Sequence, residues 1–94
     1  MKAEEKDLSE LNDYRKILDE IDARIFNDIK ERVGVVIKIG EYKRKNGIEV
    51  VHPEREMAIL RDKMEKAKLA GLDPEFIGQI YQLMIQYSRD IQSR

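Results

Sequence analysis

The 94-residue chain contains no cysteine and no tryptophan, and it has only two prolines and one histidine. Without cysteine the chain has neither a disulfide framework nor a thiol nucleophile. A transition-metal site is not expected either, because such sites are built mainly from histidine and cysteine. The composition therefore predicts a protein without disulfides, without thiol chemistry and without a transition-metal site.

Long apolar runs are also missing. No stretch approaches the length of a membrane span, and the N-terminal sequence MKAEEKDLSELND lacks the apolar segment of a secretory signal. We therefore predict a cytoplasmic protein with no membrane partner. The 18 Lys and Arg and 19 Asp and Glu residues give a formal charge of −1, whereas a nucleic-acid partner usually needs a basic domain. No nucleic-acid partner is expected, and any anion site must be a local cluster.

The remaining composition favours long, solvated helices. Hydrophobic residues make up 41% of the chain and charged residues 39%, with few helix breakers. Stop signals lie at 45–47 and around Gly71, and a proline marks the start of each following helical pattern. The sequence thus predicts an all-α fold in a single domain over residues 1–94, with helices at about 8–45, 53–70 and 74–92.

The first helix is too long for one small subunit to cover. Its apolar residues recur in steps of three and four, and this spacing continues through 34–39, where β-branched residues favour a strand locally. About 38 residues give a helix of roughly 57 Å, whereas a compact domain of this size is roughly 32 Å across. The uncovered part needs a partner, and a symmetric homodimer is the commonest solution.

One heptad-spaced line on this helix mixes apolar and charged residues, and we call it the mixed seam. Burying an unpaired charge on such a face costs several kcal/mol or more. The cations Arg32 and Lys43 are either snorkelling or salt-bridged side chains, with Asp22 and glutamates of the second helix as partners, or they line an internal cavity that binds an anion. The residues leave both interpretations open. The mixed seam comprises Arg15, Leu18, Asp22, Ile25, Ile29, Arg32, Val36, Ile39 and Lys43.

The other two helices add polar candidates. Ser88 and Gln92 are four residues apart and share a face of the third helix. Arg55 and Glu56 fall in the first turn of the second helix, and His52 precedes its first residue. Each also has an ordinary interpretation, as a polar helix end, a surface charge or a capping residue. Periodicity therefore predicts a helical dimer. An internal anion pocket is one interpretation of its charged residues, and periodicity does not identify the ligand.

The order of seven of these residues resembles the AroQ-class chorismate mutases, over about residues 10–92. These are all-helical enzymes whose three-helix subunits intertwine as homodimers. The resemblance implies a [3,3] rearrangement of chorismate to prephenate in phenylalanine and tyrosine biosynthesis, with no cofactor and no covalent intermediate. The matching residues are Arg15, Arg32, Lys43, Arg55, Glu56, Ser88 and Gln92.

The resemblance also implies individual roles. Arg32 would bind one substrate carboxylate in its own subunit, and Arg15 would reach into the partner subunit's site to bind the other. Lys43 and Gln92 would donate hydrogen bonds to the ether oxygen of the breaking bond. Arginine suits this task because its planar fork binds a carboxylate bidentately.

Four further roles follow from the same resemblance. Glu56 would accept a hydrogen bond from the ring hydroxyl, Arg55 would support the pocket, and Ser88 would lie near a carboxylate. Position 52 departs from the family, which often has Asp where this chain has His52. The backbone N–H of His52 could still serve the ring hydroxyl, so the departure affects the side-chain contribution.

Two other functions fit the same fold. Isochorismate–pyruvate lyase is the closest, and the Glu56 carboxylate favours the mutase over it. A non-enzymatic helical dimerisation module would use the apolar part of the mixed seam and none of its charges. Supplying both substrates and comparing turnover separates the lyase from the mutase. Replacing Arg32 by alanine separates an enzyme from the dimerisation module, because only an enzyme loses activity. A nucleic-acid-binding helix is opposed by the net charge.

Overall fold

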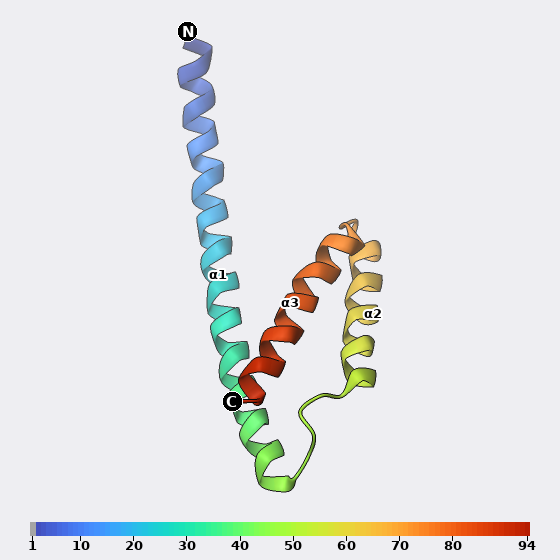
Figure 1. The fold of residues 1–94 in the computed structure, drawn as a ribbon. Coiled ribbons are helices and arrows are strands. Elements are labelled where there is room, and N and C mark those ends of the chain that lie inside the picture. The colour runs from blue at the N-terminus through green and yellow to red at the C-terminus, as the bar shows by residue number, and fades with distance from the viewer. Residues whose placement is uncertain (1) are drawn as a thin grey trace. The chain divides into compact units, whose positions relative to one another are not determined.

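Three helices make up the computed structural model of the chain, which describes residues 2–94, with side chains from residue 8 onward. They are α1 (Lys2–Asn46), α2 (Pro53–Ala70) and α3 (Pro74–Gln92) (Figure 1). The described residues contain no strand, so the predicted all-α class is confirmed. The predicted bounds of α2 and α3 are correct, and α1 starts earlier than predicted and continues through 34–39.

The helix ends follow from local sequence. Pro53 opens α2, where its missing N–H would have had no helical partner. Gly71 ends α2 in the left-handed region, with φ 77°, which side chains with a Cβ rarely adopt. Asp73 caps α3, because its Oδ1 accepts a hydrogen bond of 3.0 Å from the backbone N–H of Glu75. These signals fix a short turn between α2 and α3.

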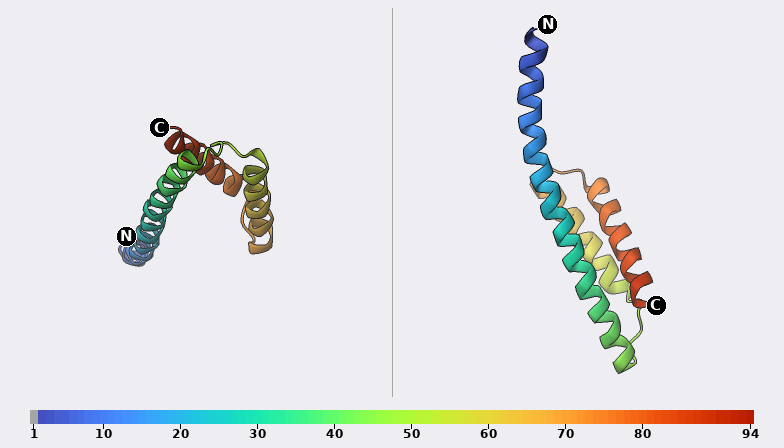
Figure 2. Two further views of the ribbon diagram at one scale, coloured as in Figure 1. Left: turned by 90° about the horizontal axis from the view of Figure 1, so that it is seen from below. Right: turned by 90° about the vertical axis from the view of Figure 1, so that its left-hand side faces the viewer.

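The chain divides into two compact units. The first unit is Met1–Val33, in which α1 is the described element, and the second unit is Gly34–Arg94. In the second unit α2 and α3 pack side by side as a hairpin (Figures 1 and 2). Gly78 of α3 makes this packing close, because a Cβ there would lie 3.2 Å from the Sδ of Met64. Among residues 8–94, for which burial is described, the buried apolar residues all lie in this unit: Val36, Ala67, Ile85 and Ile91.

The first unit exposes its apolar residues. Every described side chain from residue 8 to residue 31 is exposed, and Phe26 retains 70% of its accessible surface. On the mixed seam the chain buries Val36 and half-buries Arg32 and Lys43, while the other members stay exposed. Within one chain, the mixed seam is therefore buried, as predicted, only near the C-terminal end of the seam. Over the residues described, none of the helices is long and apolar enough to span a membrane.

Candidate active site

Lys43 organises the polar cluster at the C-terminal part of α1. Its Nζ donates hydrogen bonds to the backbone oxygen of Val50, at 2.8 Å, and to Oε1 of Gln92, at 2.7 Å. An ammonium group has three N–H donors and no acceptor, so one N–H is left for a further acceptor. Because the oxygen of Gln92 faces the lysine, its amide N–H₂ is left to donate elsewhere. The pair therefore offers two hydrogen-bond donors next to each other.

Gly40 allows α3 to approach α1 closely enough for this contact. It is buried, and a Cβ built on it would lie 3.2 Å from the Cα and 3.3 Å from the Cγ of Gln92. Ordinary carbon–carbon contacts are about 3.5–4.0 Å, so any larger residue would push Gln92 away from Lys43. Gly40 is not among the site residues predicted from the sequence. The available signal was an isolated glycine within a helical pattern, which costs about 1 kcal/mol relative to alanine and often has a packing reason.

Glu56 of α2 forms a two-point ion pair with Arg89 of α3. The Nε of Arg89 donates to Oε2 of Glu56 at 2.8 Å, and its Nη2 donates to Oε1. The Glu56 side chain is 18% exposed and that of Arg89 45%. Arg89 is not among the site residues predicted from the sequence, because a cation in the last turn of a helix is adequately explained by the helix dipole.

The same contact shifts the titration of both groups. The hydrogen bond from Arg89 is the main reason that the pKa of Glu56 lies below its ordinary value of 4.5, although partial burial opposes the shift. The charges of Arg89, Lys43 and His52 lower that pKa further. The hydrogen bond to Glu56 raises the pKa of Arg89. Glu56 and Lys43 therefore share one electrostatic environment.

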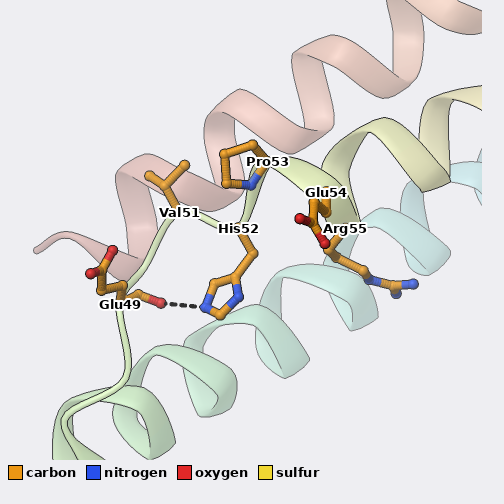
Figure 3. Close-up of a pocket in the computed structure, with 6 residues that line it drawn as sticks. All are labelled: Glu49, Val51, His52, Pro53, Glu54 and Arg55. Atoms are coloured by element: carbon orange, nitrogen blue, oxygen red, sulfur yellow. Dashed lines mark hydrogen bonds between the residues drawn. The ribbon is translucent and has the colours of Figure 1, made fainter.

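His52 occupies the N-cap position of α2 without capping it through its side chain. Its Nε2 lies 2.7 Å from the backbone oxygen of Glu49, so this nitrogen carries the hydrogen (Figure 3). Arg55 extends away from the imidazole ring (Figure 3). His52 and Arg55 both line a cavity of about 520 Å³. Its lining residues are Glu49, Val51, His52, Pro53, Glu54 and Arg55.

A second cavity, of about 600 Å³, lies between α2 and α3. Its lining combines the ion pair of Glu56 and Arg89 with apolar side chains such as Leu60 and Ile85. A charged pair beside an apolar wall is a common arrangement in sites for small organic ligands.

The structure distributes the predicted site residues over the two units. Ser88 is half-buried on α3 and donates from Oγ to the backbone oxygen of Met84 at 2.8 Å. Arg15 is exposed and Arg32 half-buried, and both lie in the first unit. The second unit brings Lys43 and Gln92 into direct contact, and the charge of Lys43 contributes to the lowered pKa of Glu56.

Comparison with protein families finds a match over most of the chain. A family model described as chorismate mutase type II matches residues 14–93, which include every residue discussed above from Arg15 to Gln92. A comparison with solved structures finds no significant match.

Three relatives illustrate the range of similar proteins. A chorismate mutase of Methanocaldococcus jannaschii is 30% identical over 87 residues, which cover 93% of this chain and 88% of the relative. A 4-amino-4-deoxychorismate mutase of Streptomyces pristinaespiralis is 29% identical over 80% of this chain and 58% of the relative. A T-protein of Enterobacter agglomerans is 26% identical over 86% of this chain, yet the match spans only 22% of that protein. The chain therefore spans most of the Methanocaldococcus jannaschii protein, about half of the Streptomyces pristinaespiralis protein and less than a quarter of the T-protein.

Proposed function

The chain belongs to the chorismate mutase type II family, and on that premise we propose that it rearranges chorismate to prephenate for the biosynthesis of phenylalanine and tyrosine. The reaction is intramolecular: the ether C–O bond breaks and a C–C bond forms within one molecule. It needs no nucleophile and no external proton donor. The polar groups of this chain suffice for it, since they can bind the two carboxylates and stabilise the charge that develops.

The contact between Lys43 and Gln92 carries this proposal. Negative charge grows on the ether oxygen as the C–O bond lengthens ahead of C–C bond formation. The ammonium N–H and amide N–H₂ left over from the 2.7 Å contact are two donors suited to that oxygen. Such donors bind the transition state more tightly than the uncharged ether of the ground state, which lowers the barrier.

Conformational restriction supplies the second part of catalysis. Chorismate is a flexible dianion, and its enolpyruvyl arm must lie over the ring before the bond can form. In the proposal Arg32 binds one carboxylate and Arg15 of the partner subunit binds the other, so that the reactive conformation is held. Ser88 lies near a carboxylate in this arrangement.

The ring substituent contacts the second helix in the proposal. Glu56 accepts a hydrogen bond from the ring hydroxyl, and the backbone N–H of His52 assists it. The lowered pKa of Glu56 supports this role, because an ionised carboxylate is purely an acceptor. Arg55 supports the pocket, and its position in the lining of the 520 Å³ cavity is consistent with that role.

The proposal includes an intertwined homodimer in the cytoplasm. The exposed apolar residues of the first unit support the dimer, because monomeric proteins rarely expose such a continuous apolar surface. Arg15 is exposed within one chain, as a residue that serves the partner's site would be. The cytoplasmic location stays a prediction from the sequence.

A direct assay tests the activity. We expect the purified protein to consume chorismate, followed by its ultraviolet absorbance, and to release prephenate as the product. The same protein is supplied with isochorismate. If pyruvate from isochorismate is the faster product, the lyase replaces the mutase as the function.

A variant separates the enzyme from a dimerisation module. We expect Arg32→Ala to lose nearly all activity while the protein stays dimeric in size-exclusion chromatography with light scattering. Lys30→Ala, which removes an exposed cation from the same helix, serves as the matched control. Unchanged turnover in Arg32→Ala would contradict the proposed role of the arginine.

A further inference from the structure

We propose that Arg89 determines substrate specificity, by making the site select a ring hydroxyl over a protonated amine at the same ring position. The inference rests on the proposed function, in which Glu56 faces that substituent. Both kinds of substrate are relevant to proteins similar to this chain, since one relative is named a chorismate mutase and others are named 4-amino-4-deoxychorismate mutases.

The geometry of the ion pair leaves Glu56 able to accept from a hydroxyl. Arg89 contacts both carboxylate oxygens, Oε2 through Nε at 2.8 Å and Oε1 through Nη2. Each carboxylate oxygen has two lone-pair sites, so each retains one for another donor. The side chain of Glu56 is 18% exposed and lines the cavity between α2 and α3. A neutral hydroxyl can therefore bind the carboxylate without displacing Arg89.

The charges around Glu56 oppose a cation at that position. An isolated carboxylate would attract an ammonium group, but the guanidinium of Arg89 neutralises this one. The ammonium group of Lys43 of α1 also acts on the carboxylate as a positive charge. Positive groups from two helices, α1 and α3, therefore act on one negative charge. An aliphatic amine is protonated at neutral pH, so a substrate carrying one would meet net repulsion, whereas a hydroxyl would not.

The test compares two substrates in matched variants. The kcat/KM values for chorismate and for 4-amino-4-deoxychorismate are measured for the wild type, Arg89→Gln and Arg89→Lys. We expect the ratio in favour of chorismate to fall about fiftyfold in Arg89→Gln, the factor that one charge interaction across roughly 7 Å produces near a protein surface. Arg89→Lys keeps the charge and is expected to keep the ratio within about threefold of the wild type.

A merely structural role predicts a different result. It would lower kcat/KM for both substrates alike and leave their ratio unchanged. Lys66→Gln removes the same charge from a lysine of α2 that pairs with Asp62 at 3.2 Å, and it is expected to leave the ratio unchanged. The pH profile gives a second readout, because loss of Arg89 raises the pKa of Glu56 and moves the acidic loss of chorismate turnover to higher pH.

A second variant keeps the inference testable if Arg89→Gln does not fold. Glu56→Gln removes the negative charge and leaves Arg89 unneutralised, so the ratio in favour of chorismate is expected to rise while both rates fall. An unchanged or lower ratio in Glu56→Gln, or an unchanged ratio in folded Arg89→Gln, overturns the inference and leaves the proposed function standing. A wild-type protein that rearranges neither substrate overturns both.

Discussion

The first and second units use similar helical sequence in different ways. The first unit, Met1–Val33, exposes each described apolar side chain up to Ile29, whereas the second unit, Gly34–Arg94, buries four apolar residues and holds the hydrogen bonds of Lys43 and the ion pair of Glu56. A regular apolar pattern therefore indicates which side chains must be buried in the working molecule, and it does not indicate which chain buries them. The second unit is organised by its own chain, whereas the first unit would be covered only in the proposed dimer.

The largest expected effect comes from placing a charge on the first unit. Ile25 is 50% exposed within one chain. If a partner subunit covers it, Ile25→Asp buries an unpaired carboxylate at a cost of several kcal/mol, which is about a thousandfold in the dimer equilibrium. We expect loss of the dimer in analytical ultracentrifugation and a parallel loss of chorismate turnover.

Leu69→Asp is the matched control, because Leu69 is an exposed apolar residue of the second unit. Surface substitutions of this kind usually change stability by less than about 0.5 kcal/mol, and we expect the dimer to persist. If the Ile25→Asp protein stays dimeric and active, the apolar face of the first unit is exposed in the functional protein as well. The contrast between the two units would then be wrong.

The next effect tests whether the second unit carries the chemistry. Lys43→Met removes the donor to Gln92 and Val50, and we expect kcat to fall about 10²–10³-fold. Circular dichroism should show the helical content of the wild type. Lys38→Met, an exposed lysine of α1, is expected to keep wild-type kcat. Equal losses in the two variants would show that the effect is not specific to the Lys43 cluster.

A smaller effect separates packing from helix propensity at two glycines of α1. Gly40→Ala must displace Gln92, whose Cα lies 3.2 Å from the new Cβ, whereas the Cβ of Gly34→Ala meets nothing within 4 Å. We expect Gly40→Ala to lower kcat about three- to tenfold, since small misplacements of catalytic groups reduce rates steeply. Gly34→Ala is expected to stabilise the helix by about 0.5–1 kcal/mol in urea unfolding. Equal activities in the two variants would remove Gly40 from the site.

The smallest effect concerns the acid stability of the second unit. Because the folded pKa of Glu56 is depressed, its ion pair stabilises the protein above the ordinary value of 4.5, and this contribution is lost as the pH falls through the lower folded value. We expect Arg89→Gln to lower Tm by a few degrees at most near neutral pH, since the pair is partly exposed. The Tm difference should vanish in strong acid. A constant difference at every pH would assign it to packing.

The sequence predicts the fold better than the site. The bounds of α2 and α3 are marked by Pro53, Gly71 and Asp73, whose conformational preferences act locally. The start of α1 lacks such a mark, because residues 2–7 are good helix formers with no breaker before them. Local signals therefore explain both the correct bounds and the error at the start of α1.

The site depends on contacts between residues far apart in the sequence. The Glu56–Arg89 pair and the approach of Gly40 to Gln92 join different helices, and neither follows from periodicity. The structure brings Lys43 and Gln92 into contact, and their catalytic roles, with those of Arg15 and Arg32, remain predictions. A heptad pattern specifies a helix face, whereas a site requires the mutual placement of several faces.

The connector between α1 and α2 has little freedom to change its length. Surface loops usually tolerate insertions and deletions, but the backbone oxygen of Val50 accepts a hydrogen bond from Lys43, and the N–H of Ile48 binds the backbone oxygen of the same lysine at 2.9 Å. One inserted residue would shift the Val50 carbonyl out of register with the Lys43 ammonium. Natural length variation among relatives should therefore avoid residues 47–52, and a designer who wishes to graft a peptide onto this protein should choose another place.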